Sequence, residues 1–124
     1  MNSHTLLLRQ VHPNFIAEGQ VSSQAFVPFP KDENKLSLYD GDQISASDSY
    51  LHYTEQLRFQ SAGVWAVTCE EAAQLNLPSK PDPLEDFPQH ALIDFTSHPA
   101  TSHRKLAKRL REFAVARGCL HAPK

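Results

Sequence analysis

The sequence has few of the residues that mark secreted or membrane-bound proteins. Its two cysteines, Cys69 and Cys119, are too few for a disulfide framework, so we expect both to be reduced, small core residues. A single bridge between them is the alternative. No apolar run approaches the ~18 residues that a membrane-spanning helix needs, and Leu6-Leu7-Leu8 is too short for the core of a signal peptide. We therefore expect a cytoplasmic protein with no membrane partner.

Motifs of the common enzyme classes are absent as well. There is no P-loop, no GxGxxG and no GxSxG elbow, which disfavours classical nucleotide-binding proteins and classical serine hydrolases. Seven histidines are many for this length, but neither HExxH nor CxxC is present. His98 with His103, or Cys119 with His121, would supply only part of a metal site. We expect no metal and no cofactor.

The length and the composition fit one globular domain spanning residues 1–124. A chain of 124 residues with 40% hydrophobic and 21% charged residues can bury one continuous core. Residues 1–100 carry thirteen acidic and five basic side chains, whereas residues 101–124 carry one acidic and seven basic side chains. The body is thus near −8 and the C-terminal segment near +6, which is more informative than the overall net charge of −2.

Hydrophobic periodicity predicts a strand-rich first part followed by alternating strands and helices. Strands are expected over residues 5–11, 20–27, 35–39, 63–68 and 91–95. A helical turn is expected over residues 14–19, and helices over residues 45–57, 69–76 and 101–117, with caps at Ser45, Thr68 and Thr101-Ser102. Residues 78–88, with four prolines, are expected to form an irregular loop. This order predicts an α+β fold: a mixed sheet of about four or five strands with two or three helices, mainly on one face.

The predicted C-terminal helix is both amphipathic and basic. Leu106, Leu110, Phe113 and Ala114 form the apolar stripe with which a helix packs on a sheet. The candidate residues for binding an anion or a partner lie on its other faces: Arg104, Lys105, Lys108, Arg109 and Arg111. Two interpretations stay open, namely a cationic binding face and a solvated face that complements the acidic body. Nucleic acid is only weakly supported as a partner, because interleaved aromatic residues and a helix-turn-helix are both missing.

A second group of candidates combines an arginine with histidines and serines. Arg9 could bind an anion and His12 could transfer a proton, with Ser22 and Ser23 completing a phosphate or ribose cradle. Lys35 and Ser37 are expected near them on an adjacent strand. The alternative is that His12 and the serines satisfy backbone groups at strand ends.

His90 is the third candidate, as a general base at the start of a strand. Asp94 or Glu70 could orient its ring. However, Asp94 lies four residues further along the same strand, roughly 13 Å away, so a direct His90–Asp94 pair is excluded in an extended segment.

Several short segments together resemble a family of small uncharacterised bacterial cytosolic proteins. These segments are Leu8-Arg9-Gln10-Val11-His12-Pro13, Ser22-Ser23-Gln24-Ala25-Phe26, Leu36-Ser37-Leu38-Tyr39, Trp65-Ala66-Val67-Thr68 and Pro88-Gln89-His90-Ala91. The resemblance implies a stand-alone bacterial protein and transfers no activity.

Two hypotheses of function follow from the sequence. The first is a non-enzymatic interaction module that binds a protein partner or an anionic ligand, partly through the basic helix. The second is a small enzyme acting on a phosphorylated, nucleotide or nucleic-acid substrate, with Arg9 binding the anion and His12 or His90 moving a proton. Whether Arg9, His12 and His90 converge in one cleft discriminates between them.

Overall fold

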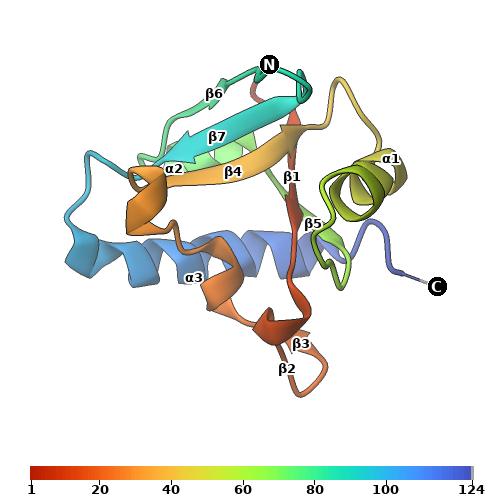
Figure 1. Ribbon diagram of the computed structural model, residues 1–124. Helices are drawn as coiled ribbons and strands as arrows, with labels where there is room; N and C mark the ends of the chain where they lie inside the picture. Colours follow the sequence, from red (N-terminus) through yellow and green to blue (C-terminus); the bar gives the residue numbers. More distant parts are fainter. Residues whose placement is uncertain (124) are drawn as a thin grey trace.

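The computed structural model describes residues 1–123, and over that range the chain forms one five-stranded sheet, one short hairpin and three α-helices (Figure 1). The sheet has the order β5-β1-β4-β7-β6. Its strands are β1 (Leu6–Gln10), β4 (Lys35–Asp40), β5 (Val64–Thr68), β6 (Ser79–Pro81) and β7 (His90–Asp94). The helices are α1 (Ala46–Leu51), α2 (Cys69–Gln74) and α3 (Ala100–Arg117). The single-domain α+β fold expected from the sequence is confirmed.

The sheet is antiparallel throughout, where the sequence favoured a mixed one. Each of its four neighbouring pairs (β5·β1, β1·β4, β4·β7 and β7·β6) runs antiparallel. The helix α2 follows β5 directly, but β5 and the next strand, β6, lie at opposite edges of the sheet. The connection is therefore not the crossover that would place parallel strands side by side.

Helices cover both faces of the sheet rather than mainly one. On one face, α3 packs its buried side chains against Leu7, Leu36, Val67 and Ile93, with α2 beside it. On the other face, α1 covers a smaller cluster built on the alternate strand residues Leu8, Tyr39, Val64 and Ala66. Alternation along each strand thus gives the sheet two apolar surfaces.

Buried polar contacts fix α1 on the sheet. Gln10 of β1 donates from Nε2 to Ser49 Oγ over 2.9 Å, and its Oε1 accepts from Ser61 Oγ over 2.9 Å. Because all three side chains are buried, these bonds must form together with the packing of the helix. The helix continues as a π-helical turn, His52–Gln56, which brings Tyr53 over the sheet.

The predicted caps are correct at two helices and wrong at the third. Ser45 accepts from Asp48 N at the start of α1, and Thr68 and Glu71 form the expected capping box at α2. The expected cap of the last helix, Thr101-Ser102, lies inside α3, which begins after Pro99. Pro99 makes no side-chain cap bond, and its extended backbone leads directly into the helix.

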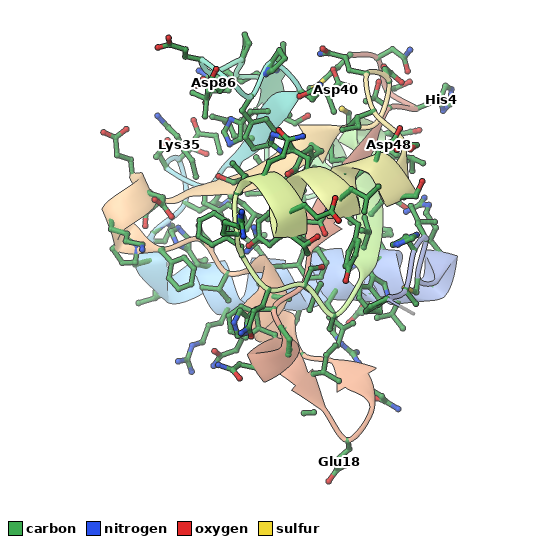
Figure 2. The ribbon with its side chains drawn as sticks, turned by 45° about the vertical axis from the view of Figure 1, so that its right-hand side comes forward. His4, Glu18, Lys35, Asp40, Asp48 and Asp86 are labelled. Carbon is green, nitrogen blue, oxygen red and sulfur yellow. The ribbon has the colours of Figure 1, made fainter. Side chains whose placement is uncertain are left out.

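The predicted strand over residues 20–27 is wrong beyond Val21. Only β3 (Gln20–Val21) is extended, paired with β2 (Ile16–Ala17). Of the helical turn expected over residues 14–19, only the start is helical, in the 3-10 turn Pro13–Phe15, and the hairpin takes the place of the rest. Its tip, at Glu18, projects from the body of the protein (Figure 2). The next residues form a 3-10 turn, Ser23–Phe26, in which the consecutive Ala25 and Phe26 are both buried. A strand would send such neighbours to opposite faces.

The two cysteines are free, as expected, but only Cys69 is partly buried. Cys119 is exposed, which contradicts its assignment to the core, because the chain has already left α3 at Gly118. Within residues 1–123, no helix is both long enough and apolar enough to cross a membrane.

Candidate functional site

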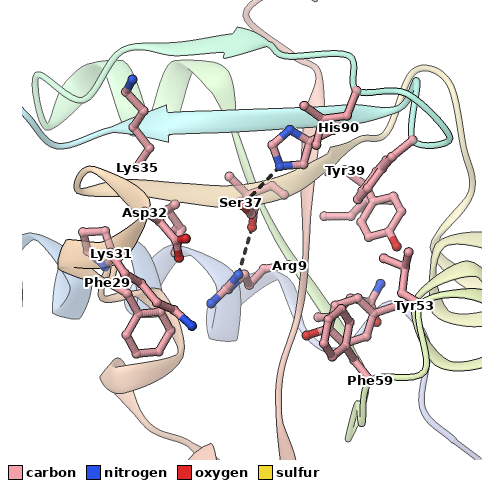
Figure 3. A pocket seen from close by; sticks show the side chains of 18 residues that line it. Arg9, Phe29, Lys31, Asp32, Lys35, Ser37, Tyr39, Tyr53, Phe59 and His90 are labelled. Atoms are coloured by element: carbon pink, nitrogen blue, oxygen red, sulfur yellow. Dashed lines mark hydrogen bonds between the residues drawn. The ribbon is translucent and has the colours of Figure 1, made fainter.

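An open pocket of about 400 Å³ lies where β1 and β4 separate (Figure 3). This volume is sufficient for a small organic molecule. Strand residues form its floor, the loop containing Phe29, Lys31 and Asp32 forms one wall, and the segment from Tyr53 to Phe59 forms the opposite wall. Arg9, Ser37 and His90 all line it.

Arg9 occupies the gap between the two strands. The pairing of β1 with β4 ends at Leu8 and Tyr39, so the backbone bonds that would continue the ladder are missing. Arg9 donates instead from Nη1 to the carbonyl oxygen of Ser37 over 2.9 Å and from Nε to that of Ala25 over 2.8 Å. Burial lowers the pKa of Arg9, although the nearby Tyr53 and Asp32 oppose this effect. The guanidinium nevertheless stays charged.

His90 lies between a hydroxyl and a carboxylate. The register of β4 with β7 places His90 opposite Tyr39, and its ring reaches diagonally to Ser37 on the same face of the sheet. Its Nε2 lies 3.1 Å from Ser37 Oγ, and its Nδ1 lies 3.1 Å from Asp82 Oδ2 and 3.0 Å from the Asp82 carbonyl oxygen. The His90 side chain is only 10% exposed, so its surroundings restrict the ring.

These partners determine which ring nitrogen of His90 carries the proton. Both oxygens of Asp82 near Nδ1 are acceptors when the carboxyl group is ionised, so Nδ1 must carry a hydrogen. In the neutral imidazole, Nε2 then presents its lone pair to Ser37, whose hydroxyl donates. This is the tautomer that allows a histidine to remove a proton from a serine.

The backbone of Ser37 is directed into the same gap as Arg9. Asp40 N–H donates to Gln89 O, so the alternation of an antiparallel ladder places the hydrogen-bonded pairs at Leu38 and Leu36. Ser37 lies between them, and its N–H and C=O therefore point away from β7, toward the missing part of the β1 pairing. The carbonyl accepts from Arg9, and the N–H is directed at the pocket.

Aromatic rings enclose the side of the pocket next to His90. Phe87 lies 4.6 Å from Tyr39, 4.8 Å from His52 and 5.0 Å from His90 between ring centres. Tyr39 Oη and His52 Nδ1 are 2.7 Å apart. Burial raises the pKa of Tyr39, with a further contribution from Tyr53, and burial likewise raises that of Tyr53 against the opposing effect of Arg9. Both phenols are neutral at ordinary pH.

The structure brings two of the three residues of the enzyme hypothesis together. Arg9 and His90 both contact Ser37, whereas His12 lies outside the pocket lining, where it caps a 3-10 turn by accepting from Asn14 N. Ser23 lies in another depression, beside Lys108 and Arg111. The orienting carboxylate is neither of those expected: Asp94 accepts from Thr96, and Glu70 is exposed in the first turn of α2.

Asp82 was missed because β6 was missed. The segment 78–88 indicated an irregular loop, but Ser79–Pro81 pairs with β7, and Asp82 N–H continues the ladder to His90 O. This pairing brings Asp82 next to His90. The only signal in the sequence is that residues 79–81 lie shortly before the strand His90–Asp94, as the first strand of a hairpin would. The prolines of this segment obscure that signal.

The cations of α3 have different surroundings. Arg111 donates to the carbonyl oxygen of Val21 and helps to hold the hairpin. Arg117 makes a bidentate ion pair with Glu71, with nitrogen-to-oxygen distances of 2.9 and 3.2 Å, and thus connects the basic helix to the acidic body. Arg109 pairs with Glu112 on the helix surface. Among residues 1–123, Arg104, Lys105 and Lys108 have no carboxylate partner, and all three are exposed.

Within residues 1–123, no group of three or more His, Cys, Asp and Glu side chains could hold a metal ion. Comparisons of this chain with protein-family models, curated proteins and solved structures find no match. The resemblance to a family of bacterial proteins therefore stays a prediction.

Proposed function

We propose that this protein is a small hydrolase that cleaves carboxylic esters through an acyl-serine intermediate. The observation that carries the proposal is the contact series Ser37–His90–Asp82 at the floor of an open pocket. It has the order of groups found in serine hydrolases, in which a base contacts the nucleophile and a third group orients the base. The serine lies on a strand rather than at the tight turn of a GxSxG elbow.

The proposed reaction has two steps. Ser37 Oγ attacks the ester carbonyl carbon while its proton passes to His90 Nε2; the bond to the alkoxy oxygen then breaks, and the leaving alcohol takes that proton. A water molecule attacks the acyl-serine in the same way, giving its proton to His90. Ser37 recovers a proton as it leaves, and the products are a carboxylic acid and an alcohol.

The gap next to Ser37 would stabilise the negative charge that develops on the carbonyl oxygen of the ester in the transition state. The backbone N–H of the nucleophile points into this gap, and the guanidinium of Arg9 makes the gap positive. Because Arg9 is held by two backbone carbonyl groups, it need not reorganise when charge develops.

A fluorophosphonate probe tests the nucleophile directly, because it reacts with an activated serine whatever the natural substrate is. We expect covalent labelling at Ser37, identified by peptide mapping, with loss of labelling in Ser37→Ala and in His90→Gln. Ser79→Ala is the matched control, because Ser79 is also a strand serine but faces the opposite side of the sheet. Absence of labelling at Ser37, or equal labelling of other serines, contradicts the proposal.

The free cations of α3 support a second proposal, which retains the interaction-module hypothesis. Arg104, Lys105 and Lys108 are exposed and unpaired within residues 1–123, and such a group attracts an anionic partner. Neutralising Arg104 and Lys108 together tests it.

A further inference from the structure

We infer that the substrate of the pocket is an amphipathic ester that carries an anionic group, a carboxylate or a phosphate. This inference rests on the proposed hydrolase function and specifies its substrate class. It depends on two properties of the pocket: a cation that makes no ion pair within residues 1–123, and an apolar rim.

Arg9 is the cation. Within residues 1–123, it makes no ion pair with a carboxylate, although its side chain is half-buried. Its bonds to Ala25 O and Ser37 O use only part of the fork of donors that a guanidinium presents. A charge removed from bulk water is stabilised best by an opposite charge, so the unused N–H groups favour an anion in the pocket.

The charged residues of the lining carry a net positive charge, with three cations against one carboxylate. Lys31 and Lys35 line the pocket with Arg9, and Asp32 is the one acidic residue of the lining. Lys35 is compensated by Glu33 over 3.2 Å, whereas Lys31 lies against the ring of Phe29, 5.7 Å from its centre. Lys31 therefore remains able to meet an anion bound by Arg9.

The rim of the pocket is apolar and solvent-exposed. Phe29, Phe59 and Leu84 are 46%, 57% and 48% exposed, and all three line the pocket. Figure 3 shows Phe29 and Phe59 on opposite sides of Arg9. Exposed apolar side chains that surround a cavity are typical of ligand sites rather than of inert surface. An acyl or aryl group between these rings would place the ester near Ser37 and the anion near Arg9.

Matched esters of 4-nitrophenol test this inference. We compare kcat/KM for 4-nitrophenyl hydrogen succinate, the analogous 3-phosphonopropionate ester and the neutral 4-nitrophenyl butyrate. We expect one of the anionic esters to be preferred over butyrate by about tenfold or more, as for a charge-assisted contact made in the transition state. The carboxylate and phosphonate arms show which anion the site takes.

Two variants assign the preference to the pocket. Arg9→Lys keeps the positive charge but loses the planar set of N–H donors of the guanidinium. Lys31→Gln removes a positive charge that makes no ion pair within residues 1–123. We expect both to lower the ratio of anionic to neutral kcat/KM. Lys80→Gln, on β6 outside the lining, should leave the ratio unchanged. Thermal unfolding identifies any loss of folding in Arg9→Lys, in which case Lys31→Gln decides.

The two possible failures are distinguishable. A ratio near one, or a ratio that neither variant changes, overturns the inference while fluorophosphonate labelling of Ser37 still supports the hydrolase. Absence of both labelling and ester cleavage overturns the hydrolase and, with it, the substrate class. In that case, calorimetry with N-phenylsuccinamate and the neutral butyranilide would still show whether the pocket prefers an anion.

Discussion

The contact between α3 and α2 gives the most direct test of how this fold is stabilised. The Glu71 carboxylate accepts from Thr68 N over 2.8 Å and from two nitrogens of Arg117 over 2.9 and 3.2 Å. Replacing Glu71 by Gln removes the charge but nearly preserves the shape. Gln can still accept from Thr68 N and thus keeps the capping box, so the substitution removes the partly buried, charge-assisted pair with Arg117, which contributes about 1–2 kcal/mol. The side chains of Arg117 and Glu71 are 26% and 18% exposed, so solvent screens the pair only in part.

We expect Glu71→Gln to lower the free energy of unfolding by about 1–2 kcal/mol at pH 7. With an unfolding entropy of ~2.1 cal/mol/K per residue, this corresponds to a decrease in Tm of about 4–8 °C. Urea unfolding followed by the fluorescence of Trp65, the only tryptophan of the sequence, measures the change. Glu70→Gln is the control, because Glu70 is exposed in the same helical turn.

The pH dependence provides the second half of this test. Burial raises the pKa of Glu71, but the hydrogen bonds from Arg117 and Thr68 outweigh this effect, so the pKa of Glu71 is lowered in the folded protein. The stabilisation is therefore fully present above the unfolded pKa of about 4.3 and is lost as the pH falls through the lower folded value. The difference in the free energy of unfolding between the wild type and Glu71→Gln should therefore decrease as the pH is lowered through this range. A difference at pH 7 no larger than that of Glu70→Gln, or one that persists unchanged in strong acid, would refute the reasoning.

Three further outcomes are expected. Asp82→Asn should lower kcat for ester cleavage by about 10- to 100-fold with little change in KM. This loss is smaller than the ~10⁴-fold loss typical of a catalytic triad, because the backbone carbonyl of residue 82 still orients the imidazole. A rise in KM as large as the fall in kcat would contradict a positioning role. Leu110→Ala, at a fully buried side chain of α3, should cost about 3 kcal/mol in urea unfolding, whereas Leu51→Ala, 46% exposed on α1, should cost much less; equal costs would contradict the assigned core. Arg104→Gln combined with Lys108→Gln should leave Tm unchanged and weaken the binding of a fluorescent polyglutamate peptide in an anisotropy assay; unaltered binding across a salt titration would exclude the helix as a binding face.

The sequence predicted most of the fold because its periodic segments are long. The strand over residues 63–68, the capping box at Thr68 and the apolar stripe of the last helix all rest on several residues that agree. The strand pattern was misleading at residues 20–27, where packing against α3 overrides the weak alternation of small residues. The mixed sheet was expected from the order of the elements along the chain, and it was wrong. Which strands lie side by side, and in which direction, depends on tertiary packing, which the order of elements does not determine.

The candidate site was only partly predictable for a related reason. Arg9 and His90 are conspicuous residue types, and Ser37 was expected near Arg9 across strands. Their convergence depends on the register of β4 with β7 and on the point where β1 leaves β4, which no local pattern encodes. Asp82 was hidden in a proline-rich segment whose short strand has too few residues to produce periodicity.

The gap between β1 and β4 also has a consequence for how the chain folds. Arg9 and Ser37 are 28 residues apart, and Ser37 and His90 are 53 residues apart, so the pocket exists only after two non-local strand pairings have formed. Local structure such as α3 can form earlier, because non-local contacts require the closure of long loops. During refolding, the helical signal should therefore recover before any property that depends on the pocket.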